Sequence, residues 1–257
     1  RKFFKSNFNI VKRRMYKIIQ KIWLWWITSS RELSKRQIAK LVSIDGYYPV
    51  IFEIGSYNGK DTQEIYRAIS GIPNIFCFEA DERIYEEFNK NIGTVEPIRL
   101  NKCAVGNFDG YSDFYLSESE TRRHSGIKEW SASSSLKQPE HHLELFKDVE
   151  FNKVKKVLTV KLDTWMKKIF NELSIKNRKI SFIWCDINGA EEDFILGAYS
   201  TLNNQTRYLY IEFSDKKLYK DQITKDRILE LLPNFELQGV YNFRGNFGNL
   251  LLRNKTL

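Results

Sequence analysis

Short apolar runs alternate with amphipathic stretches from residue 49 to the end of the chain. The runs at 49–54, 74–79, 180–187 and 207–213 are almost continuously apolar, and a helical pattern follows each of them. Continuous apolar strands separated by helices are typical of a parallel sheet that helices cover on both faces. The sequence therefore predicts an α/β fold with a doubly wound, mostly parallel sheet.

The remaining predicted elements continue this order. Further strands are expected at 97–105, 112–116 and 154–162, and a β pair at 235–240 and 247–252 would add an antiparallel edge. Helices are expected at 60–69, 81–91, 163–173, 190–200 and 223–232. The polar stretch 117–150 has no regular period, and long stretches of this kind are often lids or binding loops. We predict a lid or substrate loop there.

Composition excludes several other classes of protein. Apolar residues make up 42% and charged residues 28% of the 257 residues, which indicates a globular rather than a disordered chain. The three cysteines, Cys77, Cys103 and Cys185, lie inside apolar runs without CxxC spacing, so we expect reduced core residues. No apolar run is long enough to span a bilayer, and the start does not resemble a signal peptide. We expect a cytoplasmic protein.

Positive charge is concentrated in residues 1–45, which we predict to be a basic helical arm joined to a domain at 46–257. The whole chain has a net charge of +9, whereas the arm alone contains 12 Lys and Arg against Glu32 and Asp45, a net charge of +10. The domain is therefore nearly neutral. A basic segment attached to a neutral domain favours an interaction role for the arm.

The arm is predicted to be helical, and its use stays open. Apolar residues recur every three or four positions from Phe4 to Trp25, and Lys and Arg occupy the opposite face. Ser29 precedes Glu32 by three residues, as in a capping box, and predicts a second helix over about 30–43. The arm is suited to pack on the domain, to pair with a second subunit, or to lie at a membrane surface. Nucleic-acid binding is disfavoured, because no nucleic-acid-binding motif occurs elsewhere.

Acidic residues end several predicted strands, at the edge where open α/β sheets bind ligands. Glu53 ends the first strand and precedes the turn Gly55-Ser56-Tyr57-Asn58-Gly59, whose glycines permit a tight turn beside a nucleotide-like ligand. Glu79 ends the second strand, where an acid accepts hydrogen bonds from ribose hydroxyls. GxxxxGK[ST] is absent, which excludes a P-loop, and GxGxxG is not matched.

Two further strand ends and the predicted lid supply candidates for catalysis and substrate binding. Asp186 and Glu212 end consecutive predicted strands and are expected to share the same rim. The lid contains all three histidines of the chain together with polar side chains. The substrate-binding candidates are Arg122, Arg123, His124, Ser133, His141 and His142.

The blocks EIGSYNG, IFCFEA, NKCAVGNFDG, KVLTVKLDTW, FIWCDINGAEEDFILGA, LYIEF and GNLLL, in this order, resemble the FkbM-type methyltransferases over about residues 48–253. The resemblance implies a class I Rossmann-like fold and S-adenosylmethionine (SAM) as cofactor. It also implies methyl transfer to a hydroxyl oxygen, commonly of a sugar or a small natural product.

Carried over by position, the resemblance also implies roles for individual residues. Glu79 would hold the ribose of SAM with Ala80 beside it, and Ala104 and Val105 would flank the adenine. Asp186 would face the reacting centre. The methionine end of SAM would be lined by Glu53, Gly55, Ser56, Asn58 and Gly59. The chain departs from the family pattern at Cys185 and Asn188, where Lys and Glu are common.

We therefore predict a SAM-dependent O-methyltransferase that acts on a sugar, a glycan or a glycolipid. An alcohol needs a base to accept its proton, and the candidates are Asp186, Glu212 and His124. A divalent metal shared by Asp186 and Glu212 is a further alternative. An NAD-dependent Rossmann oxidoreductase and a non-catalytic membrane-attached module are the competing functions.

Overall fold

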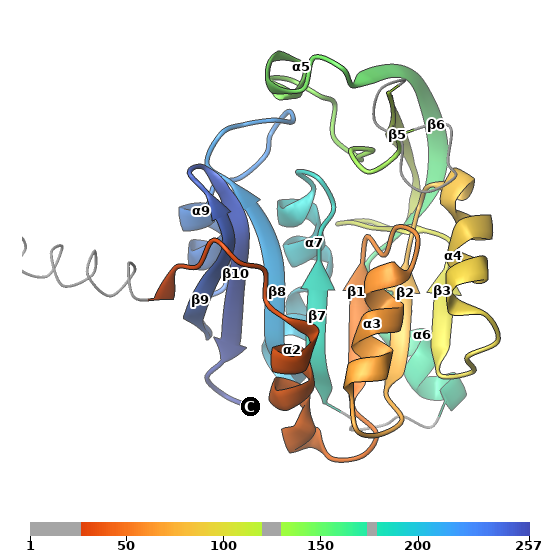
Figure 1. The fold of residues 1–257 in the computed structure, drawn as a ribbon, viewed down its shortest axis with the longest axis vertical. Helices are drawn as coiled ribbons and strands as arrows, with labels where there is room; N and C mark the ends of the chain where they lie inside the picture. The colour runs from red at the N-terminus through yellow and green to blue at the C-terminus, as the bar shows by residue number, and fades with distance from the viewer. Residues whose placement is uncertain (1–26, 120–129, 174–178) are drawn as a thin grey trace, which may run out of the picture.

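The computed structural model describes residues 27–119, 130–173 and 179–257, and its main feature is a seven-stranded sheet (Figure 1). The strand order is β3-β2-β1-β7-β8-β10-β9. The strands are β1 (Val50–Ile54), β2 (Asn74–Phe78), β3 (Ile98–Asn101), β7 (Ile180–Cys185), β8 (Thr206–Ser214), β9 (Phe235–Arg244) and β10 (Phe247–Asn254). Five strands pair in parallel, and β10 pairs antiparallel with β8 and β9. The predicted fold class is confirmed.

Helices cover both faces of this sheet, as the continuous apolar strands require. One face carries α2 (Lys35–Val42), α3 (Lys60–Ala68) and α4 (Tyr85–Ile92), whose buried side chains pack with Ile51, Ile75 and Phe182. The other face carries α6 (Leu162–Leu173), α7 (Glu191–Gly197), α8 (Tyr199–Gln205) and α9 (Lys225–Leu231). Here Phe52 and Phe78 pack against Trp165 of α6. Each central strand therefore contributes alternate residues to two cores.

A second, three-stranded sheet lies beyond the carboxyl ends of the main strands (Figure 1). It has the order β4-β6-β5 and consists of β4 (Ala104–Val105), β5 (Gly110–Glu118) and β6 (Glu150–Val160). The single strand predicted at 97–105 was wrong: β3 joins the main sheet and β4 joins the second. The chain turns between them, where the Cys103 amide donates to the Asn101 carbonyl and the Asn101 side chain donates to the Cys77 carbonyl.

The helix predicted at 190–200 is divided into α7 and α8 at Gly197 and Ala198. Gly197 lies against the backbone of the turn after β4. A Cβ atom there would stand 1.8 Å from the Gly106 carbonyl oxygen. Glycine therefore allows α7 to pack directly on the second sheet.

Helix α2 begins at Lys35, with Ser34 as its N-cap, and not near Ser29. Ser34 and Gln37 form the capping box, since the Gln37 amide donates to Ser34 Oγ and the Ser34 amide donates to Gln37 Oε1. The predicted box at Ser29 was wrong because that residue pairs with strand β9 instead. Its amide donates to the Val240 carbonyl at 2.7 Å and its carbonyl accepts from the Phe243 amide at 3.0 Å.

Residues 28–45 of the predicted arm pack on the domain. Leu33, Ile38 and Val42 are buried against the sheet, and the Leu33 amide donates to the Tyr210 hydroxyl. Arg207 of β8 forms an ion pair with Asp45. The amphipathic stretch from Phe4 to Trp25 lies outside the described residues. No helix among the described residues combines the length and apolarity that crossing a membrane requires.

Candidate active site

A cavity of about 230 Å³ lies at the carboxyl ends of β1, β2 and β7, between these strands and the second sheet. It is lined by most of the predicted cofactor residues, namely Glu53, Gly55, Ser56, Asn58, Glu79, Ala80, Ala104, Val105 and Asp186. Gly59 does not line it. Gly59 stands at the N-cap of α3 with φ +74°, where a Cβ atom would meet the Phe88 ring at 2.8 Å.

Gly55 brings the turn after β1 directly against the end of β7. Its amide donates to the Phe78 carbonyl, and the Asp186 amide donates to the Ile54 carbonyl. Gly55 has φ +85°, and a Cβ atom on it would lie 1.9 Å from the Asp186 carbonyl oxygen. The backbone of this turn can therefore form one wall of the cavity only with glycine at this position.

Gly55→Ala should destabilise the protein by about 1–3 kcal/mol more than Gly245→Ala, as judged by urea unfolding. Gly245 is the matched control, because it has φ +72° and open space around the added Cβ atom. In Gly245→Ala the free energy of unfolding should fall only by the cost of placing alanine in the left-handed conformation, about 1–2 kcal/mol. Equal losses in the two variants would show that the turn can move away from Asp186.

Two buried carboxylates face the cavity with backbone and hydroxyl donors around them. The Glu79 carboxylate accepts from the Tyr57 amide and the Asp81 amide, each at 2.8 Å. Burial raises the pKa of Glu79 to about 7. The Glu53 carboxylate accepts from the Thr62 hydroxyl, and burial raises its pKa to about 8. A ligand that donates hydrogen bonds or carries positive charge favours the ionised form of both groups.

Asp186 and Glu212 form a hydrogen-bonded carboxyl pair at the ends of β7 and β8. Asp186 keeps an exposed surface and Glu212 is half-buried. Desolvation raises the pKa of each above its usual range, more strongly for Glu212. Two adjacent carboxyls share a proton because both cannot ionise readily. Glu212 therefore donates to an ionised Asp186 near neutral pH. Across the described residues, no three His, Cys, Asp or Glu side chains gather as a metal site.

Asn188 holds residues 132–135 of the predicted lid over the cavity by hydrogen bonds. It has φ +53°, and its side-chain amide donates to the Ala132 carbonyl at 3.0 Å and the Ser134 carbonyl at 3.1 Å. The Ser135 hydroxyl donates back to the Asn188 carbonyl at 2.7 Å. A glutamate at position 188, common in the FkbM family pattern, has no N–H group for these two bonds. This departure from the pattern therefore has a structural role here.

Asn188→Asp should loosen residues 131–135, because a carboxylate would replace a donor opposite two carbonyl oxygens. Asp tolerates positive φ as Asn does, so the backbone preference is nearly unchanged. We expect a loss of about 1–3 kcal/mol in unfolding free energy and faster amide hydrogen exchange in this segment. The control is Asn242→Asp at φ +47°, with a change below about 0.5 kcal/mol. Unchanged exchange at 131–135 would argue against the anchoring role.

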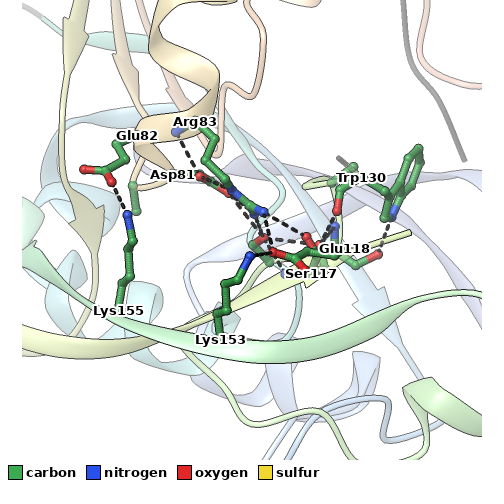
Figure 2. A network of polar contacts seen from close by, with 12 residues as sticks. Asp81, Glu82, Arg83, Ser117, Glu118, Trp130, Lys153 and Lys155 are labelled. Atoms are coloured by element: carbon green, nitrogen blue, oxygen red, sulfur yellow. Dashed lines mark hydrogen bonds and ion pairs between the residues drawn. The ribbon is translucent and has the colours of Figure 1, made fainter. Parts of the chain in front are cut away.

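Arg83 joins the acidic end of β2 to the second sheet and to the lid, as Figure 2 shows. Its guanidinium donates to both Asp81 carboxylate oxygens, to the Ser117 carbonyl at 3.2 Å and to the Ser134 hydroxyl at 3.1 Å. The Asp81 and Arg83 side chains are 3% and 16% exposed, so the pair is shielded from solvent screening. The geometry of Glu79 is thus held by the same network that holds the lid.

The predicted substrate residues are not brought together at the cavity. His141 is exposed beside Glu144, and His142 is buried against Phe146 and Tyr219. Ser133 accepts the Trp130 indole N–H through its hydroxyl, and none of these three residues lines the cavity. Arg122, Arg123 and His124 lie outside the described residues.

Several cavity residues had no signal in the sequence, or only a weak one. Ser131 and Ser134 line the cavity in place of Ser133, a distinction that a run of serines does not reveal. Asp61 and Trp184 also line it, and Lys35 of α2 lies 2.6 Å from an Asp61 carboxylate oxygen. The approach of Lys35 follows from the packing of α2 and not from any local motif.

Comparison with known proteins agrees with this geometry. The family described as "Methyltransferase FkbM domain" matches residues 53–243. The 2-O-methyltransferase NoeI of Sinorhizobium fredii (strain NBRC 101917 / NGR234) is 35% identical over 230 residues, which cover 90% of this chain and 88% of that protein.

Solved structures with a similar arrangement are methyltransferases at low sequence identity. The O-methyltransferase from Bacillus cereus in complex with SAH is 15% identical with a TM-score of 0.45, covering 86% of this chain and 81% of that chain. The magnesium protoporphyrin IX methyltransferase from Synechocystis PCC 6803 with bound SAM is 11% identical with a TM-score of 0.43, covering 84% and 76%. On the family match and the NoeI relative, the chain belongs to the FkbM family of SAM-dependent methyltransferases.

Proposed function

We propose that this methyltransferase acts on a hydroxyl group of a sugar or glycan, and that Asp186 accepts the proton of that hydroxyl. The observation that carries the proposal is Asp186 at the cavity wall, hydrogen-bonded to Glu212, which stands behind it and does not line the cavity. The relative NoeI is named a 2-O-methyltransferase, which supports an oxygen acceptor here as well. The family assignment replaces the alternatives of an NAD-dependent oxidoreductase and a non-catalytic module.

The residues around the cavity fit SAM. A carboxylate offers about four acceptor positions, and backbone amides of Tyr57, Ala80 and Asp81 take three of those on Glu79. Glu79 can therefore still accept from a ribose hydroxyl. Glu53 and Asp61 present carboxylates that would face the ammonium group of the methionine end. Ala104 and Val105 supply an apolar wall for the base.

SAM supplies a methyl group on a positively charged sulfur, so the donor needs no further activation. The chain must hold the acceptor oxygen in line with the carbon–sulfur bond and remove its proton. Asp186 lines the cavity, and its raised pKa makes it a stronger base than an aspartate with the ordinary pKa. Glu212, which donates to Asp186, keeps that carboxylate oriented. The lid residues 131–136 restrict access of water.

Two assays test this proposal on the purified chain. Calorimetric titration with S-adenosylhomocysteine (SAH), with NAD as the negative control, tests the cofactor. Transfer of labelled methyl groups to a panel of neutral sugars, with catechol and a carboxylic acid as non-sugar acceptors, tests the acceptor class. We expect SAH binding, no NAD binding and labelled sugar ethers. SAH binding with transfer only to the non-sugar acceptors would overturn the sugar assignment.

A further inference from the structure

A second cavity lies beside strand β5, which also borders the cofactor cavity. Tyr111, Asp113 and Tyr115 of β5 pair directly with Leu158, Lys156 and Val154 of β6, so all six share one face of the second sheet. Phe114, the alternate residue, lines the cofactor cavity instead. Strand β5 therefore contributes side chains to both cavities.

The groove, as we call this second cavity, is an open depression with a volume of about 450 Å³. The face of the second sheet forms one side, residues 106–108 a second, the lid residues 136–138 a third and residues 220–221 a fourth. Leu136 lines both the groove and the cofactor cavity. A molecule that reaches the cofactor cavity past Leu136 can therefore extend into the groove.

The groove exposes two aromatic side chains to solvent. The Tyr111 side chain is 69% exposed, more than any other large apolar side chain in the described ranges, and Phe108 is 44% exposed. Aromatic rings at exposed sites in a concave surface are suited to stack on a ligand. The faces of sugar rings carry C–H groups that stack on such rings.

The charges of the groove balance each other. Lys137, Lys156 and Lys220 stand against Asp113, Asp193 and Asp221. Lys156 is 2.9 Å from Asp113, and Lys137 is 2.7 Å from Asp193. Such a surface attracts neither a phosphate chain nor a cationic ligand, yet it offers many donors and acceptors for neutral hydroxyls.

A hydrogen bond and close packing hold the floor of the groove. The Asn107 side-chain amide donates to the Asp193 carboxylate at 2.9 Å, and α7 packs on the Gly106 backbone through Gly197. The lid wall is tied to the loop after β8, since the Lys220 amide donates to the Gln138 carbonyl at 2.8 Å. A preformed surface loses little conformational entropy when it binds a ligand.

We propose that the groove binds the neutral sugar units that adjoin the methylated one, so that the acceptor is an oligosaccharide and not a free monosaccharide. This inference rests on the proposed function and adds the length of the acceptor. Tyr111 and Phe108 stack on sugar rings, and the paired charges and the Gln138 amide bind hydroxyls.

The test uses three neutral sugars: glucose (as cellotetraose and maltotetraose), mannose and xylose. For each sugar it compares kcat/KM for methyl transfer to the tetrasaccharide and to the methyl monoglycoside. The wild-type chain should prefer a tetrasaccharide. Tyr111→Ala and Phe108→Ala should each reduce that preference about three- to tenfold, mainly through KM, without changing transfer to the monoglycoside. Tyr48→Ala is the matched control, because Tyr48 is 53% exposed before β1, at the opposite end of the sheet.

The outcomes separate the two proposals. Sugar methylation that is independent of chain length, or a preference that neither groove variant changes, overturns the groove and leaves the proposed function intact. SAH binding without transfer to any of these sugars contradicts the sugar acceptor, and the groove proposal falls with it.

Discussion

Asp186→Asn should lower kcat about 100- to 10,000-fold and leave SAH affinity within about threefold. The asparagine keeps the size of the side chain but cannot accept the acceptor's proton at neutral pH. Labelled methyl transfer measures kcat, and calorimetry with SAH measures the retained cofactor site. A variant with unchanged kcat would remove Asp186 from the base role and direct attention to residues 120–129, which include His124.

Glu212→Gln is the matched control for Asp186→Asn. Glutamine still donates a hydrogen bond to Asp186, so we expect this variant to keep its kcat within about tenfold.

The pH profile of the wild-type rate gives a second test of Asp186 as the base. Asp186 must be ionised to act, and desolvation at the cavity raises its pKa. The wild-type rate should therefore rise with pH through an inflection above the ordinary aspartate value of about 4. That inflection should be absent from Asp186→Asn.

Glu79→Ala should weaken SAH binding roughly 100-fold, the second large effect that we expect. The change removes a charged acceptor for a ribose hydroxyl and also releases the amides of Tyr57 and Asp81. Hydrogen bonds to charged groups contribute about 1.5–3 kcal/mol each. The matched control is Glu82→Ala, since Glu82 is an exposed neighbour whose ion pair is with Lys155. The SAH affinity of Glu82→Ala should stay within twofold to threefold of the wild-type value, a difference of about 0.5 kcal/mol.

The affinity of wild-type SAH binding should also fall as pH decreases below about 7. Burial raises the pKa of Glu79 to about 7, so the free protein becomes protonated there as the pH falls. Binding that needs the carboxylate must then displace a proton, at a cost of about tenfold in affinity for each pH unit. Glu79→Ala should lack this dependence. A wild-type affinity that is flat from pH 5 to pH 8 would contradict the role of Glu79.

The sheet and its acidic edge were predictable because their signals are local. Continuous apolar strands identify a covered parallel sheet, and a strand that ends in an acid places that acid at a known edge. The two capping boxes show where local signals fail. Ser29-x-x-Glu32 and Ser34-x-x-Gln37 are equally good motifs, and only the pairing of Ser29 with β9 decides between them.

The parts of the site that the sequence did not reveal depend on tertiary contacts. Asn188 looks like a turn residue until the lid carbonyls of Ala132 and Ser134 are placed beside it. His142 was a substrate-binding candidate in a polar loop, yet it is buried and packs beside Phe146. Side chains of the same type thus differ in role according to neighbours that are distant in the chain.

The pairing of residues 28–31 with β9 has a consequence for the residues that precede them. Backbone hydrogen bonds at Ser29 and Arg31 fix the chain to the sheet edge, and α2 then carries Lys35 to Asp61 at the cofactor cavity. The point at which residues 1–26 join the domain is therefore fixed relative to the cofactor cavity. Anything that residues 1–26 bind is tethered to that one point of the sheet edge, and the cavity lies at a set distance from it.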